Sequence, residues 1–238
     1  MAVTQPRYWA VVVAAGAGTR MGEGLPKPYR PLLGRRVLEW SAAPFLRAGW
    51  VDGVVVVRAP GDAALFAALD LARHPRVIPV TGGATRAASV IAGLQRVDHL
   101  AVAPERTWVL VHDGARPCLR DEDLRALRDG ATTEAGGLLA SPVTDTLKRH
   151  SGGRVQETVD RQALARALTP QMFPLRSLLT ALLSAQAERR EVTDEASAVE
   201  ASGLRPRLIT GQASNLKITY PEDLVLAQFW LQQAGALA

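Results

Sequence analysis

The sequence predicts an α/β fold: a Rossmann-like, mostly parallel sheet with helices on both faces and an inserted β-hairpin. Short apolar runs alternate with longer amphipathic stretches along the chain, which is typical of βαβ units. The first run, residues 9–14, is apolar throughout and stops at glycines, as expected of a strand buried on both faces. The length of 238 residues fits one domain with an appendage. We therefore expect a single domain over residues 1–238.

Strands and helices alternate regularly in the first half of the chain. Val37, Trp40 and Phe45 have roughly helical spacing and predict a helix at 37–48. The remaining elements predicted here are strands at 53–57, 77–80 and 107–113 and helices at about 62–73 and 85–97. This order predicts parallel strands joined by helices that cover both faces of the sheet.

The region 138–160 departs from this alternation. It contains two polar strand-like segments around the turn signal at 151–153, which predicts a β-hairpin arm at about 141–160. Such a hairpin is marginal alone and must lie on its own domain or on a partner subunit. The elements predicted after it are helices at about 175–189, from near Asp194 and from Pro221, and a strand at about 206–210.

Composition excludes several classes of protein. Hydrophobic residues make up 47% and charged residues 21% of the chain, so a disordered chain is excluded. The longest apolar run, at 9–15, is too short to cross a bilayer, and no secretory signal is recognised at the N-terminus. Cys118 is the one cysteine and suits a reducing compartment. We expect a cytoplasmic protein with no membrane partner.

The basic residues argue for small anionic ligands. The net charge is +5, but the arginines are spread along the chain and do not alternate with aromatic residues, so no nucleic-acid partner is expected. A modest positive excess also attracts phosphorylated substrates. Only Lys27, Lys148 and Lys217 are lysines, and a compact ammonium is not interchangeable with a guanidinium. These lysines could also be chance survivors.

The strongest local signal is the segment AAGAGTRMGEGLPKPY at 14–29. Glycines after a buried strand let the backbone approach phosphate oxygens, and Arg20 and Lys27 add two cations. The segment is neither a Walker A loop nor a GxGxxG dinucleotide fingerprint, because the glycines and Lys27 are wrongly spaced. It predicts a polyphosphate site; the alternative is an ordinary flexible loop.

A second signal is VHDGARPC at 111–118. Asp113 follows a predicted strand at the edge where open α/β sheets bind ligands. A carboxylate beside phosphates is typical of a Mg²⁺ site, and Arg116 could reach a second phosphate. The alternative is a salt-bridged turn.

These segments carry a resemblance to a known family. AAGAGTRMGEGLPK, GGATRAASV, VHDGARP, PVTDTLK, TVDR, LTPQMF, TDEASAVE and NLKITYPEDL occur in the order seen in 2-C-methyl-D-erythritol 4-phosphate cytidylyltransferases, from about residue 9 to 226. The first motif indicates only the wider nucleotidyltransferase superfamily. TDEASAVE together with NLKITYPEDL resembles the methylerythritol enzymes specifically.

The resemblance implies that CTP and 2-C-methyl-D-erythritol 4-phosphate give the CDP-alcohol and pyrophosphate. Arg20 and Lys27 would bind the triphosphate, and Asp113 would ligate Mg²⁺ or another divalent cation. The implied cytidine pocket comprises Ala14, Ala15, Gly16, Gly18, Gly82 and Ser89. The residues implied to contact or position the polyol phosphate are Arg116, Ser141, Arg161, Thr169, Thr193 and Lys217. The hairpin would be a dimerisation arm, with Arg161 serving the partner's site in a homodimer.

Two alternatives stay open. One is the same chemistry on another polyol phosphate, such as ribitol 5-phosphate, because part of the motif set is shared with ribitol-phosphate cytidylyltransferases. The other is a nucleotide-binding module without catalysis. The sequence also departs from the family pattern at Pro28, Gly83, Gly114 and Ser141, which commonly are Gln, an acid, Ala and Thr.

The chemistry implied by the resemblance needs no general base. A phosphate monoester is already a nucleophile at neutral pH, so the transfer needs in-line positioning and charge neutralisation. We expect the four histidines to be structural or exposed, with His112 the one that could touch a ligand. Cys118 is expected to be a packed small residue.

Overall fold

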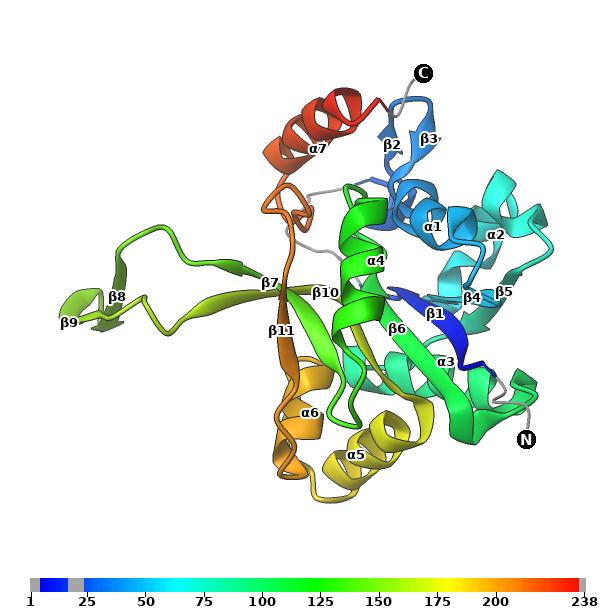
Figure 1. The fold of residues 1–238 in the computed structure, drawn as a ribbon. Coiled ribbons are helices and arrows are strands. Elements are labelled where there is room, and N and C mark those ends of the chain that lie inside the picture. The colour runs from blue at the N-terminus through cyan, green and yellow to red at the C-terminus, as the bar shows by residue number, and fades with distance from the viewer. Residues whose placement is uncertain (1–4, 17–23, 236–238) are drawn as a thin grey trace.

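A sheet of seven strands forms the centre of the computed structural model, which describes residues 5–16 and 24–235 (Figure 1). The strand order is β11-β7-β10-β6-β1-β4-β5. Its strands are β1 (Arg7–Ala14), β4 (Gly53–Arg58), β5 (Val77–Thr81), β6 (Thr107–Asp113), β7 (Gly137–Pro142), β10 (Ala165–Pro174) and β11 (Arg207–Thr210). Only β10 runs antiparallel to its neighbours in this sheet. The predicted mostly parallel α/β sheet is confirmed.

Alternate residues of the central strands face two separate cores. In β1, Ala10 and Val12 belong to one hydrophobic cluster, while Val11 belongs to the other. All three side chains are fully buried, which explains why the strand is apolar at every position. The sequence pattern and the two-sided burial therefore agree.

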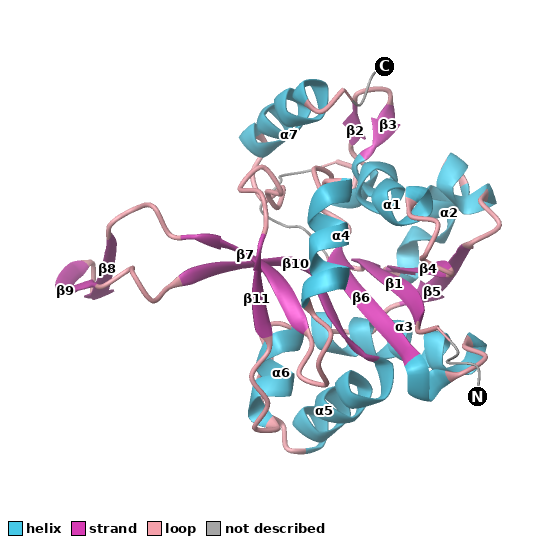
Figure 2. Cartoon of the chain, viewed as in Figure 1, coloured by secondary structure: helices cyan, strands magenta, loops and turns pink. Residues whose placement is uncertain are grey.

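Helices cover both faces of the sheet (Figure 2). The helices are α1 (Val37–Arg47), α2 (Ala63–Ala67), α3 (Arg86–Leu100), α4 (Asp121–Gly130), α5 (Leu175–Ala187), α6 (Glu195–Ala201) and α7 (Glu222–Gln233). Side chains of α1, α2 and α4 pack in one cluster, and those of α3, α5 and α6 pack in the other. Helix α7 packs with α1 and with the small hairpin of β2 (Pro31–Leu32) and β3 (Arg35–Arg36) in a third cluster.

One predicted helix needs correction, and some elements were missed. The helix predicted at 62–73 is broken into a 3-10 turn at Pro60–Asp62, the short α2, and another 3-10 turn at Asp70–Arg73. Leu69 is extended between them, and the break lets Phe66, Leu69 and Leu71 all reach the same core, which one continuous helix face could not do. Helix α4, strand β10 and the small hairpin of β2 and β3 were not predicted from the sequence.

The predicted hairpin is confirmed only in its outer part. Gly137 to Ser141 are buried in the main sheet as part of β7, because Leu138 and Leu139 pack into the two cores. The hairpin itself consists of β8 (Leu147–Ser151) and β9 (Arg154–Val159). Gly152 and Gly153 form its turn with φ of 55° and 76°, a conformation that favours glycine.

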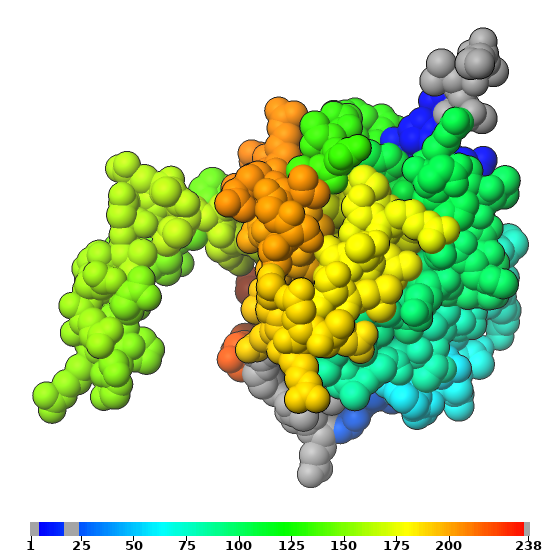
Figure 3. Space-filling model, turned by 90° about the horizontal axis from the view of Figure 1, so that it is seen from below, coloured from blue at the N-terminus to red at the C-terminus, as the bar shows by residue number. Residues whose placement is uncertain are grey.

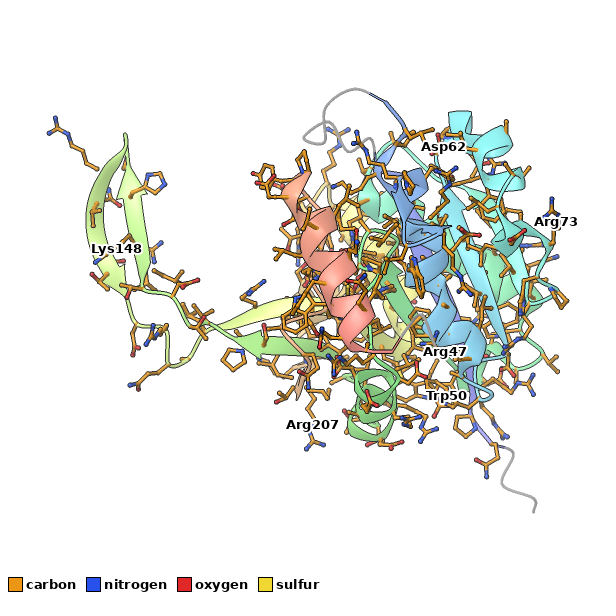
Figure 4. All side chains as sticks on the ribbon, turned by 90° about the horizontal axis from the view of Figure 1, so that it is seen from above. Arg47, Trp50, Asp62, Arg73, Lys148 and Arg207 are labelled. Carbon is orange, nitrogen blue, oxygen red and sulfur yellow. The ribbon has the colours of Figure 1, made fainter. Side chains whose placement is uncertain are left out.

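The arm stands away from the rest of the chain (Figure 3). Its strands are joined by side chains as well as by the backbone: Arg149 pairs with Glu157 at 2.6 Å, and Lys148 donates a hydrogen bond to Thr158 at 2.7 Å. Lys148 lies on this projecting hairpin, well separated from the body (Figure 4). Across the residues that the structure describes, no helix has the length and apolar character needed to cross a membrane.

Candidate active site

A cavity of about 320 Å³ opens at the carboxyl ends of β1 and β6. These strands are neighbours, with Val13 opposite Asp113, and the chain leaves β1 toward β4 on the opposite side from β6. Such a reversal of strand order is where open α/β sheets bind ligands. The lining residues are Val13, Ala14, Ala15, Gly16, Lys27, Pro28, Gly83, Ala84, Thr85, Arg86, Ser89, Asp113, Ala115 and Lys217.

The cavity brings together residues that were predicted from separate motifs. Lys27, Ser89, Asp113 and Lys217 all line it, together with the backbone at the end of β1. A larger cavity of about 850 Å³ lies among residues of α1, α4 and α7 and contains none of the predicted site residues. The predicted site residues that line a cavity therefore all lie at the smaller one.

Asp113 is the carboxylate at the centre of this cavity. Its Oδ2 lies 3.0 Å from Nζ of Lys217 and 3.4 Å from Nε of Arg116, and its Oδ1 lies 3.3 Å from Nη2 of Arg86. Burial alone would raise the pKa of the Asp113 carboxyl, but the charges of Arg86, Lys217 and Arg116 hold that pKa well below its usual range. Asp113 is therefore a fixed anion at neutral pH.

Arg86 and Glu195 are functional candidates that the sequence reasoning missed. The Arg86 guanidinium donates to Glu195 Oε1 at 2.6 Å and to Oε2 at 3.2 Å, a two-pronged geometry typical of strong arginine–carboxylate pairs. Burial raises the pKa of the Glu195 carboxyl, an effect that the Arg86 charge opposes. The available signal was the position of both residues inside quoted motifs, GGATRAASV and TDEASAVE.

The predicted cytidine pocket depends on close packing between β1 and α3. A Cβ at Gly82 would lie 2.7 Å from Ala15 Cβ and from Ser89 Oγ, so only glycine fits there. Ser89 Oγ accepts from Gly83 N–H at 3.2 Å and lies 3.3 Å from Gly83 O. Ser89 therefore fixes the turn before α3, and Gly82 lets that turn approach the end of β1.

The predicted acceptor residues fall into two groups. Arg116, Ser141 and Thr169 are buried near Asp113 or at the end of β7, and the Ser141 hydroxyl has no hydrogen-bond partner within the described chain. Thr169 Oγ1 accepts from Asp113 N–H at 3.1 Å and hydrogen-bonds His112 Nδ1 at 2.9 Å. The Thr169 hydroxyl thus positions Asp113, while the Ser141 hydroxyl keeps its bonding capacity for another group.

Arg161 and Thr193 are not brought to the cavity of their own chain. Both are exposed and neither lines it. Arg161 donates to the backbone carbonyl of Thr144 at the base of the arm, and Thr193 contacts Ser197 at the start of α6. Gly18 and Arg20 lie outside the described residues.

His112 and Cys118 are structural, as expected. His112 is fully buried and hydrogen-bonds the Arg116 carbonyl at 3.1 Å, and burial lowers its pKa to about 4. Cys118 packs in the cluster under α7, and burial raises the pKa of its thiol to about 12. A neutral ring and a protonated thiol supply neither a cation nor a nucleophile at neutral pH.

The departures from the family pattern have local explanations at three positions. A Cβ at Gly83 would lie 2.6 Å from Ala88 Cβ, and a Cβ at Gly114 would lie 3.0 Å from the Val13 carbonyl oxygen. Any side chain at Gly83 therefore requires the turn to shift. Pro28 lines the cavity within the 3-10 turn Lys27–Tyr29, where a proline at the first helical positions is well tolerated.

The fold and the site define an α/β nucleotidyltransferase. The protein-family model IspD, 2-C-methyl-D-erythritol 4-phosphate cytidylyltransferase, matches residues 8–233. A relative of that name from Klebsiella pneumoniae is 47% identical over 237 residues, 98% of each chain. Another from Cronobacter sakazakii is 48% identical over 93% of this chain and 92% of its own.

Solved structures agree with the sequence relatives. A crystal structure of a 4-diphosphocytidyl-2C-methyl-D-erythritol synthase matches with a TM-score of 0.82 and 40% identity, covering 95% of this chain and 99% of that one. The cytidylyltransferase from Thermus thermophilus matches with a TM-score of 0.73 and 31% identity over 96% of this chain and 100% of its own. The chain belongs to the 2-C-methyl-D-erythritol 4-phosphate cytidylyltransferase family.

Proposed function

We propose that the protein transfers a cytidylyl group from CTP to the phosphate of 2-C-methyl-D-erythritol 4-phosphate. The products are 4-diphosphocytidyl-2-C-methyl-D-erythritol and pyrophosphate, in non-mevalonate isoprenoid precursor synthesis. The observation that carries this proposal is family membership over nearly the whole chain, combined with a cavity that gathers Lys27, Asp113 and Lys217.

The transfer is a single displacement at the α-phosphorus of CTP. An oxygen of the acceptor phosphate forms the new bond to phosphorus, and the bond from phosphorus to the oxygen bridging the α- and β-phosphates breaks. Pyrophosphate leaves with that electron pair, so no proton has to be removed from the nucleophile. The chain's task is to hold the two phosphates in line and to offset the negative charge of the transition state.

The positions of the described cations support this proposal. Lys27 and Lys217 both line the cavity, where ammonium groups can hold the phosphates of donor and acceptor. The backbone from Ala14 to Gly16 and the turn at Gly83 border the same space and suit the nucleoside. Arg20 and Gly18 complete the nucleotide side in this proposal.

The residues present fit a divalent cation brought by the nucleotide. Mg²⁺ typically takes one or two protein carboxylates and completes its coordination with substrate phosphates and water, and Asp113 borders the phosphate cavity. No group of three His, Cys, Asp or Glu side chains within the described ranges could hold a metal alone. When bound, Mg²⁺ would offset phosphate charge beside Asp113.

We also propose that the active form is a homodimer. The arm projects from the body (Figure 1), and most of the side chains on its two strands are exposed. A two-stranded hairpin is marginally stable without further packing. A partner subunit would supply that packing, and Arg161 at the arm's base would then reach the partner's acceptor site. The cytoplasmic location stays a prediction.

A substrate panel tests the proposed reaction. CTP, ATP, GTP and UTP are each paired with 2-C-methyl-D-erythritol 4-phosphate and with ribitol 5-phosphate, with Mg²⁺ or with EDTA, and pyrophosphate release is followed. We expect rapid release only with CTP, methylerythritol phosphate and Mg²⁺. Preference for ribitol 5-phosphate would support the alternative acceptor. Release unaffected by EDTA would contradict the metal assignment.

A further inference from the structure

Arg86 connects two buried carboxylates from distant parts of the chain. It lies at the first position of α3, and its guanidinium reaches Asp113 on β6 and Glu195 on α6 at the same time. Glu195 is 1% exposed and does not line the cavity. Its carboxylate is therefore linked by hydrogen bonds to the site through Arg86.

We propose that Glu195 is a positioning residue: by fixing the Arg86 guanidinium, it fixes the Asp113 carboxylate that faces the phosphates. This inference rests on the proposed function, in which Asp113 borders the reacting groups. Glu195 uses both oxygens on Arg86 at 2.6 and 3.2 Å, and this pairing sets the plane of the guanidinium. On its other edge, Nε and Nη2 of Arg86 each lie 3.3 Å from Asp113 Oδ1.

The two oxygens of Asp113 are then held from different sides. Arg86 contacts Oδ1, whereas Lys217 and Arg116 contact Oδ2. With Arg86 released, only the Oδ2 contacts would remain, and the carboxylate could rotate about its χ2 torsion. Because the transfer depends on in-line geometry, a small rotation of a charged group beside the phosphates lowers the rate of the chemical step.

Other contacts hold α6 in place, so anchoring the helix does not explain Glu195. Gln171 on β10 donates to Asp194 at 2.9 Å and accepts from Ala196 N–H at 2.8 Å. Asp194 and Ser197 form a capping box at the helix start. A buried ion pair is moreover a poor source of stability, since desolvation of both charges offsets their attraction. The orientation of Arg86 therefore explains the buried Glu195 carboxylate better than a role in stability does.

The test compares Glu195→Gln with wild type. Glutamine keeps the shape but offers one acceptor, so its amide N–H groups face the guanidinium and the paired contact is lost. We expect kcat per CTP-binding site to fall by about 10- to 100-fold, as for other residues that orient a ligand of the reacting groups, while the KM for CTP stays near the wild-type value. The number of CTP-binding sites is measured by isothermal titration.

Three further variants keep the test decisive. Arg86→Lys retains the charge but cannot bridge two carboxylates with a planar fork, so we expect the same selective loss of kcat. Because both changes break one chain of contacts, the double variant should be no slower than the slower single variant. Glu195→Asp keeps the charge and should recover part of the rate.

Arg176→Gln is the matched control. It removes the ion pair in which Arg176 Nε lies 3.1 Å from Oδ1 of Asp98, and Asp98 is near the other end of α3. The kcat of this variant should equal that of wild type. A kcat per binding site unchanged in Glu195→Gln, or a double variant whose losses multiply, would overturn the positioning role. All rates are measured with the acceptor that the wild-type protein turns over. If the proposed acceptor is wrong, the wild-type protein itself shows this. That result is distinct from a failure of the inference about Glu195.

Discussion

At the residue scale, the candidate site crowds single charges into a small space. Asp113 has cations on both of its oxygens, and the cavity beside it is bordered by Lys27 and Lys217. Lys27 is 8% exposed. Only three lysines occur in the chain, and two of them line this one cavity. At the residue scale, the scarcity of lysine was a usable signal.

Lys27→Arg should be poorly tolerated although it conserves charge. The guanidinium is wider and planar, and it cannot take the place of a compact ammonium in a buried phosphate site. We expect kcat to fall by about 10²- to 10³-fold, as for loss of one contact to the transition state. Lys148→Arg, the same change on the exposed arm, is the control. If the two variants are equally active, a compact ammonium is not required at position 27.

His112 should make stability depend on pH. Burial lowers its pKa to about 4 in the folded chain, whereas an unfolded histidine titrates near 6.5. Below pH 6.5 the unfolded chain binds a proton that the folded chain does not bind, so this contribution to stability is complete above pH 6.5 and is lost as pH falls toward 4.

Urea unfolding at pH 7.5 and pH 5 measures this effect. Wild type should lose about 2 kcal/mol more than His112→Gln over that interval. His150→Gln, on the arm, serves as the control and should follow wild type. If His112→Gln and wild type lose the same free energy of unfolding between these pH values, the buried neutral ring of His112 does not cause the pH dependence.

At the scale of elements, the regular βα units were predictable and the irregular segments were not. The strand at 107–113 matches β6 to the residue, because its apolar run directly precedes the polar site. β10 was missed because Pro170 and Pro174 argue against a central strand. Pro170 nevertheless lies where the pairing with β7 shifts register, between Ala167 and Gln171, so no ladder hydrogen bond is required there.

The candidate site divides in the same way. Asp113 and Lys27 could be predicted because the end of an apolar strand and a glycine-rich loop are both recognised from adjacent residues in the sequence. The Arg86–Glu195 contact could not, since its partners are 109 residues apart. They meet because α3 and α6 both pack against α5 and the start of α6 is bonded to β10. Helix α4 was missed because its apolar contribution rests on two buried leucines, Leu124 and Leu127, among acidic and basic residues.

The start of α3 holds the turn that we propose to border the nucleotide. Thr85 caps this helix, with Oγ1 accepting from Ala88 N–H at 3.0 Å. Thr85→Ala should lower the free energy of unfolding by about 1 kcal/mol, since an N-cap contact is lost. Thr85→Ser retains the hydroxyl and should lose much less. Equal destabilisation in thermal unfolding would show that the cap is not responsible.

At the scale of the whole molecule, the residues proposed to bind the acceptor do not all gather in one chain. Lys217 lines the cavity of its own chain, whereas Arg161 lies at the base of the arm and does not. In the proposed homodimer each active site combines Lys217 of one chain with Arg161 of the other. The arm is then part of the catalytic apparatus as well as of the interface.

Mixing two inactive variants tests this arrangement. Arg161→Ala and Lys217→Ala should each be nearly inactive through loss of charge-assisted phosphate contacts. In a mixed dimer, one site carries both changes and the other carries neither. Random exchange makes about half of the dimers mixed, so roughly a quarter of wild-type activity should return. If exchange is confirmed by mass and no activity returns, both residues serve the same chain's site.

The central claim is that the cavity beside Asp113 directs one displacement at the α-phosphorus of CTP, without a nucleophile from the protein. Its most direct test uses CTP that carries sulfur on the α-phosphorus in one known configuration, with 2-C-methyl-D-erythritol 4-phosphate as acceptor. A single in-line displacement predicts a cytidylylated product of inverted configuration at that phosphorus. Retained configuration would reveal a covalent intermediate on the protein and would contradict the account.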